Sequence, residues 1–452
     1  MESVRIGAGA AYAGDRIEPA VELARDADLD YLVFECLAER TIALAEYRQR
    51  GGGVGYNELL EERIERVIPH CIEHDVTVIT NMGAADPAGA TAAARAVVDD
   101  CDASLTVASV TGSDVTDGFD AFDDETFGDE AVADYRDRAV GAHAYLGVDG
   151  VVEALERGAD IVIGGRIADP SLFLSAMVHE FGWSPSALES PVAVGQGIAI
   201  GHLLECAGQL TGGYFADPGR KEVPDLGRLG FPYATVAREG SASVHSLPET
   251  GGRVTEATCT EQLLYETADP ARYVTPDAVA DFGGVTLEPV DRAVDGEPVA
   301  GIAVSGATAA PRTETLKVNV SYDDGWIGVG ELSYAGQNAL ERAELAADVV
   351  RTRLDTVGVD PRELRVDYVG VDALHGTTGR ERADDPYEVR LRVAGKCDAE
   401  SDARAVAREV ERLYTNGPAG GGGASMDVRR NVGIVSTLLA RSAVEPAVSV
   451  DE

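Results

Sequence analysis

Two short apolar runs of the sequence end in side chains that can bind an anion and move a proton. Residues 160–165 run into Arg166, and residues 76–80 run into Asn81. A guanidinium that follows a doubly buried strand is placed to clamp a carboxylate or a phosphate. Asp169 opens an Asp-Pro-Ser sequence and is either a general acid or base or only a helix cap. We therefore expect a site for a small anionic organic substrate here.

A second candidate is the segment 201–219. On a helix, His202, Glu205 and Gln209 fall on one face. His and Glu three residues apart occur in metal sites, but no third ligand is recognisable, so we predict no metal and interpret Glu205 as a buried general acid or base. Cys206 is either a nucleophile or a buried, inert thiol.

Lysine is rare in this chain. Only three of the 38 basic residues are lysines, namely Lys221, Lys317 and Lys396. If selection has removed lysine from the surface, the remaining ones are enriched in roles that arginine cannot fill, such as a compact ammonium beside an oxyanion or enolate. We expect Lys317 to face the ligand and to take part in catalysis. The alternative is that it is a neutral leftover.

A glycine-rich stretch follows a predicted helix near the end of the chain. Successive glycine amides can form a nest that binds phosphate or carboxylate. The expected ligand-binding positions are Asn416, Gly417, Gly420, Gly421, Gly422 and Gly423. The stretch lacks the Gly-Lys-Ser/Thr of a P-loop, so NTP hydrolysis is not expected. A flexible connection is the alternative.

The first predicted strand runs into a Gly-x-Gly sequence that partly matches a dinucleotide fingerprint. Glu35 ends the second strand, where a ribose-binding acid would lie. Tyr12 occupies the third-glycine position, where close packing needs Gly or Ala, so a plain tight turn is the default and no cofactor is predicted. We expect Gly9 and Asp15 to line a ligand pocket at the edge of the sheet.

Short apolar runs and helical patterns alternate in the first half of the chain. The predicted strands are 4–10, 30–36, 76–80, 104–110 and 160–165. Runs without polar alternation are typical of strands buried on both faces of a parallel sheet, and ligands bind at the carboxyl ends of such strands. We predict a layered α/β domain with a mainly parallel sheet over residues 1–235. The acidic segment 113–130 is expected to be a surface loop or lid.

The second half has a different pattern. Segments 316–322 and 326–336 flank Asp-Asp-Gly, which predicts a hairpin. The following helices and strands give a β-α-β-β-α-β order, a ferredoxin-like (split βαβ) arrangement. We therefore predict a second, α+β domain over residues 236–452, with the glycine-rich loop near its end.

Composition limits the class of protein. With 38 basic and 78 acidic residues, the formal charge is −40, and molar salt would screen the resulting self-repulsion. We expect a halophile's cytoplasmic protein that does not bind nucleic acid. No run of about 18 apolar residues and no basic leader is present, so neither a membrane span nor a signal peptide is expected. The six cysteines form no C-x-x-C pair, which argues against disulfides and zinc.

Five segments, in this order and at these spacings, resemble the acyclic terpene utilisation (AtuA-like) family. They are GDRIEPAVELARDADLDYLVFECLAE (14–39), GADIVIGGRIADPSLFL (158–174), GHLLECAGQLTGGYFADPG (201–219), TLKVNVSYDDGWIGVGELSYAG (315–336) and LYTNGPAGGGG (413–423). The resemblance covers about Arg5 to about Ala443. Tyr12, Cys36 and the acidic segment 113–130 depart from the family's pattern.

The resemblance implies a role in the breakdown of branched acyclic terpenoids, a pathway that proceeds through CoA thioesters. We expect an enzyme, or the main subunit of one, with lyase or hydratase-like chemistry on an acyl or hydroxyacyl substrate, with CoA as part of that substrate. The alternative is a non-catalytic scaffold that binds an acyl-CoA carboxylase or a small ferredoxin-like subunit. Many relatives carry a further ferredoxin-like domain, so the resemblance implies either a separate small partner subunit of that kind or its absence. We also expect a homo-oligomer.

Overall fold

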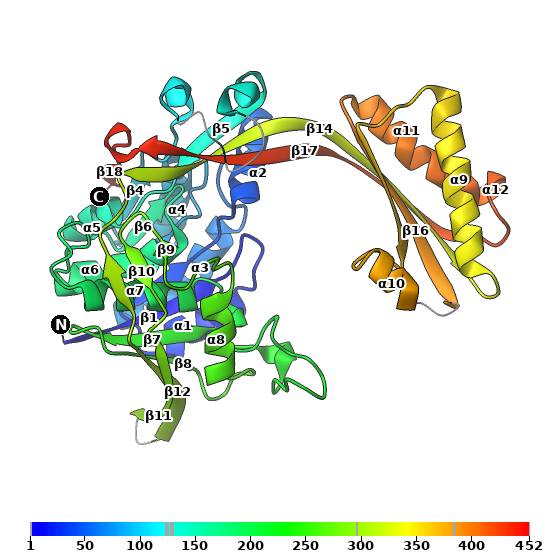
Figure 1. The fold of residues 1–452 in the computed structure, drawn as a ribbon. Coiled ribbons are helices and arrows are strands. Elements are labelled where there is room, and N and C mark those ends of the chain that lie inside the picture. Colours follow the sequence, from blue (N-terminus) through cyan, green and yellow to red (C-terminus); the bar gives the residue numbers. More distant parts are fainter. Residues whose placement is uncertain (1, 123–125, 127–130, 295–296, 383–385, 452) are drawn as a thin grey trace. The chain divides into compact units, whose positions relative to one another are not determined.

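The computed structural model describes residues 2–122, 126, 131–294, 297–382 and 386–451. The chain divides into two compact units. Unit 1 comprises residues 1–321 and 434–452, and unit 2 comprises residues 322–433. Both boundaries lie within long strands that are labelled in Figure 1, β14 (Thr315–Ala335) and β17 (Gly422–Ala440).

Unit 1 is built on a mixed sheet of ten strands among the described residues. In spatial order they are β11 (Thr286–Val294), β12 (Glu297–Ser305), β8 (Ala242–Ser246), β7 (Pro232–Ala237), β1 (Ser3–Ala10), β2 (Tyr31–Phe34), β3 (Thr77–Thr80), β6 (Ile161–Gly164), β4 (Val107–Thr111) and β18 (Ala447–Asp451). The run from β1 to β4 is parallel, which confirms the five predicted strands. The other pairs in this sheet are antiparallel, so the sheet is mixed rather than mainly parallel.

Helices pack against the parallel strands, whose side chains are therefore almost entirely buried. The α-helices of unit 1 are α1 (Glu18–Asp26), α2 (Glu39–Arg50), α3 (Leu60–His74), α4 (Pro87–Asp100), α5 (Asp149–Glu156), α6 (Asp169–Phe181), α7 (Pro191–Leu204) and α8 (Glu256–Leu264). Short 3₁₀ turns are η1 (Thr116–Ala121), η2 (Val132–Arg138), η3 (Ala207–Gln209), η4 (Leu226–Arg228) and η5 (Arg441–Ala443). Helix α3 shows the local logic, because Ile64, Val67, Ile68 and Cys71 form one buried stripe.

Smaller elements complete unit 1. A three-stranded antiparallel sheet consists of β13 (Thr308–Ala310), β10 (Val279–Asp281) and β9 (Tyr273–Val274), and β5 (Ala139–Ala144) pairs with β14. Within the acidic segment 113–130, the described part includes η1, whereas residues 123–125 and 127–130 lie outside the described residues. No helix in the described part of the chain is long and apolar enough to cross a membrane.

The compact units differ from the expected division near residue 235. The segment 235–247 does not begin a new domain, because β7 and β8 pair with each other and β7 extends the large sheet beside β1. The predicted hairpin at Asp323-Asp324-Gly325 is wrong, since β14 continues through it as one strand. Gly325 does adopt a φ of 78°, the turn-like geometry that the sequence indicated, but as a local irregularity inside the strand.

Unit 2 has a sheet with the order β15-β16-β14-β17, in which β15 is Glu363–Val369 and β16 is Glu388–Cys397. Strand β16 pairs antiparallel with both β15 and β14. Its helices are α9 (Ala339–Val357), α10 (Thr377–Arg382), α11 (Glu400–Glu411) and α12 (Leu413–Asn416). Helices α9 and α11 both pack on β16 over an apolar core that includes Leu332, Val350, Leu391 and Val406. Alternate residues of β16 are buried, as expected when helices cover one face of a sheet.

Candidate active site

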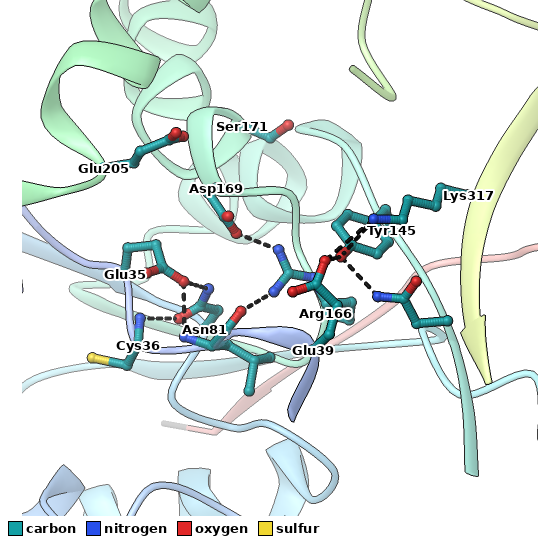
Figure 2. Close-up of polar contacts among 12 residues, drawn as sticks. Glu35, Cys36, Glu39, Asn81, Tyr145, Arg166, Asp169, Ser171, Glu205 and Lys317 are labelled. Atoms are coloured by element: carbon teal, nitrogen blue, oxygen red, sulfur yellow. Dashed lines mark hydrogen bonds and ion pairs between the residues drawn. The ribbon is translucent and has the colours of Figure 1, made fainter. Parts of the chain in front are cut away.

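Three polar side chains follow three neighbouring parallel strands of unit 1. Glu35 follows β2, Asn81 follows β3, and Arg166 follows β6 after Gly165. Because β2, β3 and β6 are adjacent and parallel, these residues lie at one edge of the sheet. Figure 2 shows them together with Asp169, Glu39, Tyr145 and Lys317.

Arg166 is the central cation of this cluster. Its side chain is buried, one terminal nitrogen donates to the Leu37 carbonyl oxygen, and the other donates to Asp169. The guanidinium carbon lies 4.3 Å from the centroid of the Tyr145 ring, a cation–π contact. With these partners and no exposed surface, Arg166 is placed to hold protein groups rather than to clamp a ligand directly.

Asp169 is the first residue of α6, and Arg166 holds its carboxylate. The helix has no side-chain cap, and its N-cap position is Ala168, so the interpretation of Asp169 as a cap is wrong. About a third of the side chain remains exposed, 35%. Burial raises the pKa of Asp169, and the Arg166 guanidinium opposes that rise. The Asp169 carboxylate thus pairs with Arg166 and remains partly accessible to solvent.

Glu35 is more deeply enclosed. Its Oε1 accepts hydrogen bonds from the Leu37 amide at 2.7 Å and from Asn81 Nδ2 at 3.0 Å. Asn81 is buried as well, and its Oδ1 accepts from the Cys36 amide at 2.8 Å. Burial raises the pKa of Glu35 to about 8, and the charge of Asp169 adds to the rise. Two carboxyl groups close enough to repel each other therefore share this edge of the sheet.

The exposed side of the cluster carries a second cation. Lys317 Nζ, on β14, lies 3.2 Å from Glu39 Oε1 and 3.5 Å from the Tyr145 hydroxyl oxygen. The Tyr145 hydroxyl donates to Glu39 Oε1 at 2.6 Å, and Asn319 Nδ2 donates to the Tyr145 oxygen at 2.9 Å. The Lys317 side chain is 41% exposed, so its ammonium is accessible to a ligand.

Glu39 is the anion that pairs with the Lys317 ammonium. Burial acts to raise the pKa of Glu39, but the hydrogen bond from Tyr145 and the nearby Lys317 and Arg166 charges outweigh it and lower the pKa to about 2. Glu39 is therefore ionised near neutral pH, when it pairs with the Lys317 ammonium.

A second buried acid lies at the end of α7. His202 Nδ1 and Glu205 Oε1 are 2.6 Å apart, and the Tyr273 hydroxyl lies 3.2 Å from the same nitrogen. Burial raises the pKa of Glu205 to about 7, although His202 acts to lower it. Glu205 Oε2 is buried and has no hydrogen-bond partner. The charge of Asp169 also raises the pKa of Glu205, which places this acid within electrostatic reach of the first cluster.

The His202–Glu205 contact agrees with the spacing in the sequence, but the helix ends earlier than expected. Helix α7 ends at Leu204, so Gln209 lies in η3 and does not continue the same helical face. Burial raises the pKa of the Cys206 thiol far above its ordinary value, which favours the inert thiol over the nucleophile. In the described part of the chain, no group of three or more His, Cys, Asp and Glu side chains is suited to hold a metal ion.

Two predicted ligand positions near β1 have local structural contacts. Gly9 is buried, and a Cβ there would approach the Phe34 ring to 2.7 Å, so the position needs glycine for packing. Asp15 closes the turn after β1, because its Oδ2 accepts from the Ala11 amide at 2.9 Å. The Arg63 guanidinium donates to the Asp15 carbonyl oxygen at 3.1 Å. These contacts stabilise the edge of the sheet.

The glycine-rich stretch belongs to unit 2, whereas all the residues above belong to unit 1. Gly422 and Gly423 begin β17, and Gly420 and Gly423 have φ angles of 79° and 65°. The carbonyl oxygens on this stretch accept hydrogen bonds, with Arg342 donating to Ala419 and Arg390 donating to Gly423. Asn416 Nδ2 donates to the Arg412 carbonyl oxygen, and Gly417 and Gly421 pack against Leu413 and Leu332.

Sequence reasoning did not anticipate Glu39 and Tyr145. Glu39 lies four residues after Glu35, at the start of α2. The sequence does show this acid close to the end of a predicted strand, and that position is a signal that could have identified it. Tyr145 follows β5, whose residues, AVGAHA, are too small and mixed to read as a buried strand. Glu35 was noticed only as a ribose-binding acid.

Comparison with known proteins identifies the family. Residues 4–450 match the family model described as acyclic terpene utilisation family protein AtuA. The chain belongs to the AtuA family. Membership suggests involvement in acyclic terpene utilisation. No curated protein and no solved structure matches the chain.

Proposed function

We propose that this AtuA family protein is an enzyme, or the main subunit of one, that adds or removes water next to the carbonyl group of a branched acyl thioester. The observation that carries the proposal is the pair of carboxyl groups, Glu35 and Asp169, beside Arg166 and Lys317. The pKa of Glu35, about 8, favours its protonated form at neutral pH. Burial raises the pKa of Asp169, whereas the charge and hydrogen bond of Arg166 favour the ionised form that the proposal uses as the base. One acid and one base at the same edge are the groups that such a reaction requires.

In the dehydration direction, Asp169 takes the proton from the carbon next to the carbonyl. The negative charge that develops on the carbonyl oxygen faces the Lys317 ammonium. Glu35 gives its proton to the departing hydroxyl group, which leaves as water, and a carbon–carbon double bond remains. Hydration is the reverse. Carbon–carbon cleavage next to a carbonyl would use the same base and cation.

The other residues of the cluster have positioning roles in this proposal. Arg166 holds Asp169 and the face of Tyr145, and Asn81 orients Glu35. Tyr145 and Glu39 fix the Lys317 ammonium near the exposed side. A thioester of CoA suits the proposal because its carbonyl accepts charge in an enolate and its phosphates are anionic. Glu205, with an unpartnered buried oxygen, is a second candidate for the proton-transfer role.

Deuterium exchange tests this proposal. The protein is incubated in D₂O, in concentrated salt, with 3-hydroxy-3-methylbutanoyl-CoA, and exchange at the carbon next to the carbonyl and loss of water are followed by NMR. Wild type should do both. Asp169→Asn should lose both by about 10²–10⁴-fold, whereas Glu35→Gln should keep the exchange and lose the release of water.

Glu180→Gln is the matched control, because Glu180 accepts a hydrogen bond from Tyr31 and is not part of the cluster. It should retain wild-type rates. If wild type catalyses neither exchange nor dehydration, or if Asp169→Asn and Glu35→Gln match Glu180→Gln, the proposed chemistry is wrong. A stoichiometric complex with another protein and no reaction with thioesters would instead favour a scaffold.

We also propose a ferredoxin-like arrangement for unit 2. The supporting observation is its element order, β14-α9-β15-β16-α11-β17, together with the sheet order β15-β16-β14-β17. These are the connections of a split βαβ fold. The arrangement is confined to residues 322–433, about half of the segment for which it was expected.

A further inference from the structure

Strand β17 forms one edge of the sheet of unit 2. It is last in the order β15-β16-β14-β17, beside β14, and nearly every residue from Gly423 to Arg430 is exposed. Among the described residues, side chains bond the Gly423 carbonyl oxygen and the Ser425 hydroxyl, but no backbone group of residues 424–429. An edge strand of this kind presents N–H and C=O groups to which another strand can bind.

The opposite edge strand, β15, is protected by its own chain. The Tyr368 amide donates to Asp372 Oδ1 at 2.8 Å, and the Tyr368 carbonyl oxygen accepts from the Asp372 amide at 3.0 Å. The segment that follows β15 therefore occupies the edge at Tyr368. Protection of this kind prevents pairing with another chain. The contrast favours β17 as the edge that binds a partner.

The side chains of β17 alternate between the two faces of the sheet. Ser425 Oγ donates to Glu331 Oε2 at 3.0 Å, and Ser425, Asp427 and Arg429 line one shallow pocket on that face. Val428 lies on the other face, where it packs against the apolar core that the helices cover. Asp427 and Arg429 form an ion pair. Two unlike charges thus lie two residues apart on the same face of an exposed edge.

We propose that β17 pairs antiparallel with β17 of a second copy of the chain, with the two-fold axis at Val428. Residues that lie opposite each other in an antiparallel pair share a face and are about 5 Å apart. Asp427 then lies opposite Arg429 of the partner subunit, and the same pair recurs on the other side of the axis. Val428 lies opposite Val428 of the partner subunit on the apolar face.

Charge complementarity selects this register. Moving the axis by one residue places either Asp427 opposite its own copy or Arg429 opposite its own copy, and like charges directly opposite destabilise a sheet. Each copy has a formal charge of −40, so two copies repel each other at low salt. Molar salt, with a Debye length of roughly 3 Å, screens that repulsion. The backbone hydrogen bonds of the paired edges do not depend on salt in this way.

Charge reversal tests the proposal in the full chain. Sedimentation equilibrium in concentrated salt should show a dimer of wild type at micromolar concentration. Asp427→Arg and Arg429→Asp each place like charges opposite at two positions, so each should weaken dimerisation about tenfold or more. An equimolar mixture of the two variants should dimerise again, because every opposite pair then has unlike charges. The two side chains are 54% and 45% exposed, so neither substitution disturbs the core.

Glu400→Arg is the matched control. Glu400 lies on α11 in unit 2, is 46% exposed and pairs with Arg404. This variant makes the same change of charge at an acid of a surface ion pair, away from β17. It should dimerise as wild type does.

Disulfide formation tests the register. In a Cys101→Ser background, which removes an exposed thiol, Val428→Cys places two thiols opposite each other. Their Cα separation of about 5 Å suits a disulfide, so oxidation should give a linked dimer. Met426→Cys should not give one, because the two copies of that position lie about 13 Å apart along the paired strands.

Four results would overturn the proposal. One is a wild type that stays monomeric at the highest soluble concentration, and another is undiminished dimerisation of both charge variants. A third is a dimer of Val428→Cys that oxidation does not link. The fourth is a monomeric wild type whose complex with a different protein is abolished by Asp427→Arg, which would assign the edge to that protein. The edge lies in unit 2, and the acids of the proposed reaction lie in unit 1, so the two proposals fail independently.

Discussion

Glu35 and Glu205 are both buried, yet their surroundings differ. Glu35 accepts hydrogen bonds from two neutral donors, the Leu37 amide and Asn81, and the charge of the nearby Arg166, which pairs with Asp169, also acts to lower its pKa. Glu205 has an ionisable partner, His202, and leaves one oxygen without any partner. The pKa of Glu35 is raised to about 8 and that of Glu205 to about 7.

The two residues differ in which neighbours oppose the rise in pKa that burial causes. For Glu35, the charge of Arg166 and the two neutral donors favour the ionised form, but they do not offset burial and the charge of Asp169. For Glu205, the His202 imidazole favours the ionised form, and burial still leaves the pKa raised. Glu35 should therefore hold its proton at neutral pH, and Glu205 should share its proton with His202. Four substitutions test this distinction, and they follow in order of decreasing expected effect.

Arg166→Met removes the cation on which Asp169 depends. The free energy of unfolding should fall by about 3–5 kcal/mol, because the partly buried Asp169 carboxylate loses the cation that is hydrogen-bonded to it. Urea unfolding at a fixed salt concentration measures this loss in the free energy of unfolding. Arg25→Met is the control, since Arg25 pairs with Asp26 on the surface and should cost no more than about 1 kcal/mol. Equal costs for the two variants would show that Arg166 does not stabilise the cluster.

Glu35→Gln changes how stability depends on pH. The pKa of Glu35 rises from its ordinary 4.5 to about 8 on folding, so the folded state binds the proton more tightly than the unfolded state between these values. Stability of wild type should therefore fall as pH rises from 5 to 9, with a contribution on the order of 4 kcal/mol from this residue.

The variant should lose that contribution. Its free energy of unfolding should therefore fall less than that of wild type between pH 5 and pH 9. Urea unfolding at the two pH values measures the difference. Glu180→Gln should follow wild type. If Glu35→Gln does the same, the carboxyl group of Glu35 is not held in its protonated form.

His202→Phe should raise the pKa of Glu205 above about 7, because His202 acts to lower it. Phenylalanine keeps the ring between Tyr273 and Phe282, whose centroids lie 4.7 and 5.7 Å away. Carbon-13 NMR of labelled glutamate should show the change at Glu205 and leave Glu35 near 8. A Glu205 pKa that stays near 7 in this variant would mean that burial alone sets it.

Glu39→Gln should have the smallest effect. The pKa of Glu39 is lowered to about 2 on folding, so its contribution is present above pH 4.5 and is lost as pH falls toward 2. The side chain is 42% exposed, so solvent screening limits the loss at pH 7 to less than about 1 kcal/mol. The difference from wild type should shrink at pH 3. A loss of several kcal/mol would indicate that Glu39 supports the whole cluster.

The parallel strands were predictable because continuous β-branched runs are typical of strands buried on both faces. The continuous strand β14 was not, since Asp-Asp-Gly carries the same local signal in a hairpin and in an irregular strand. The division into the two compact units was not predictable for a related reason. Pairing between β1 and β7 joins residues more than 200 positions apart, and no local pattern records it. The adaptation of this protein to high salt, expected from its acidic composition, stays a prediction.

Of the candidate site, Asn81, Arg166, Asp169 and Lys317 were found from strand ends and from the rarity of lysine. The sequence order does not show that Arg166 is buried and faces Asp169 rather than the solvent. Glu39 and Tyr145 were missed because their roles arise only when α2, β5 and β14 meet. The glycine-rich stretch was grouped with them by residue type, whereas the structure assigns it to unit 2.

The most direct test of the account is the pKa of Glu35 in the folded protein. Carbon-13 NMR of the glutamate carboxyl carbons, assigned by the spectrum of Glu35→Gln and recorded from pH 5 to 10 in concentrated salt, measures it. We expect a midpoint near 8, with Glu35 protonated at neutral pH. A midpoint near the ordinary 4.5 would mean that Glu35 is ionised there and does not serve as the acid.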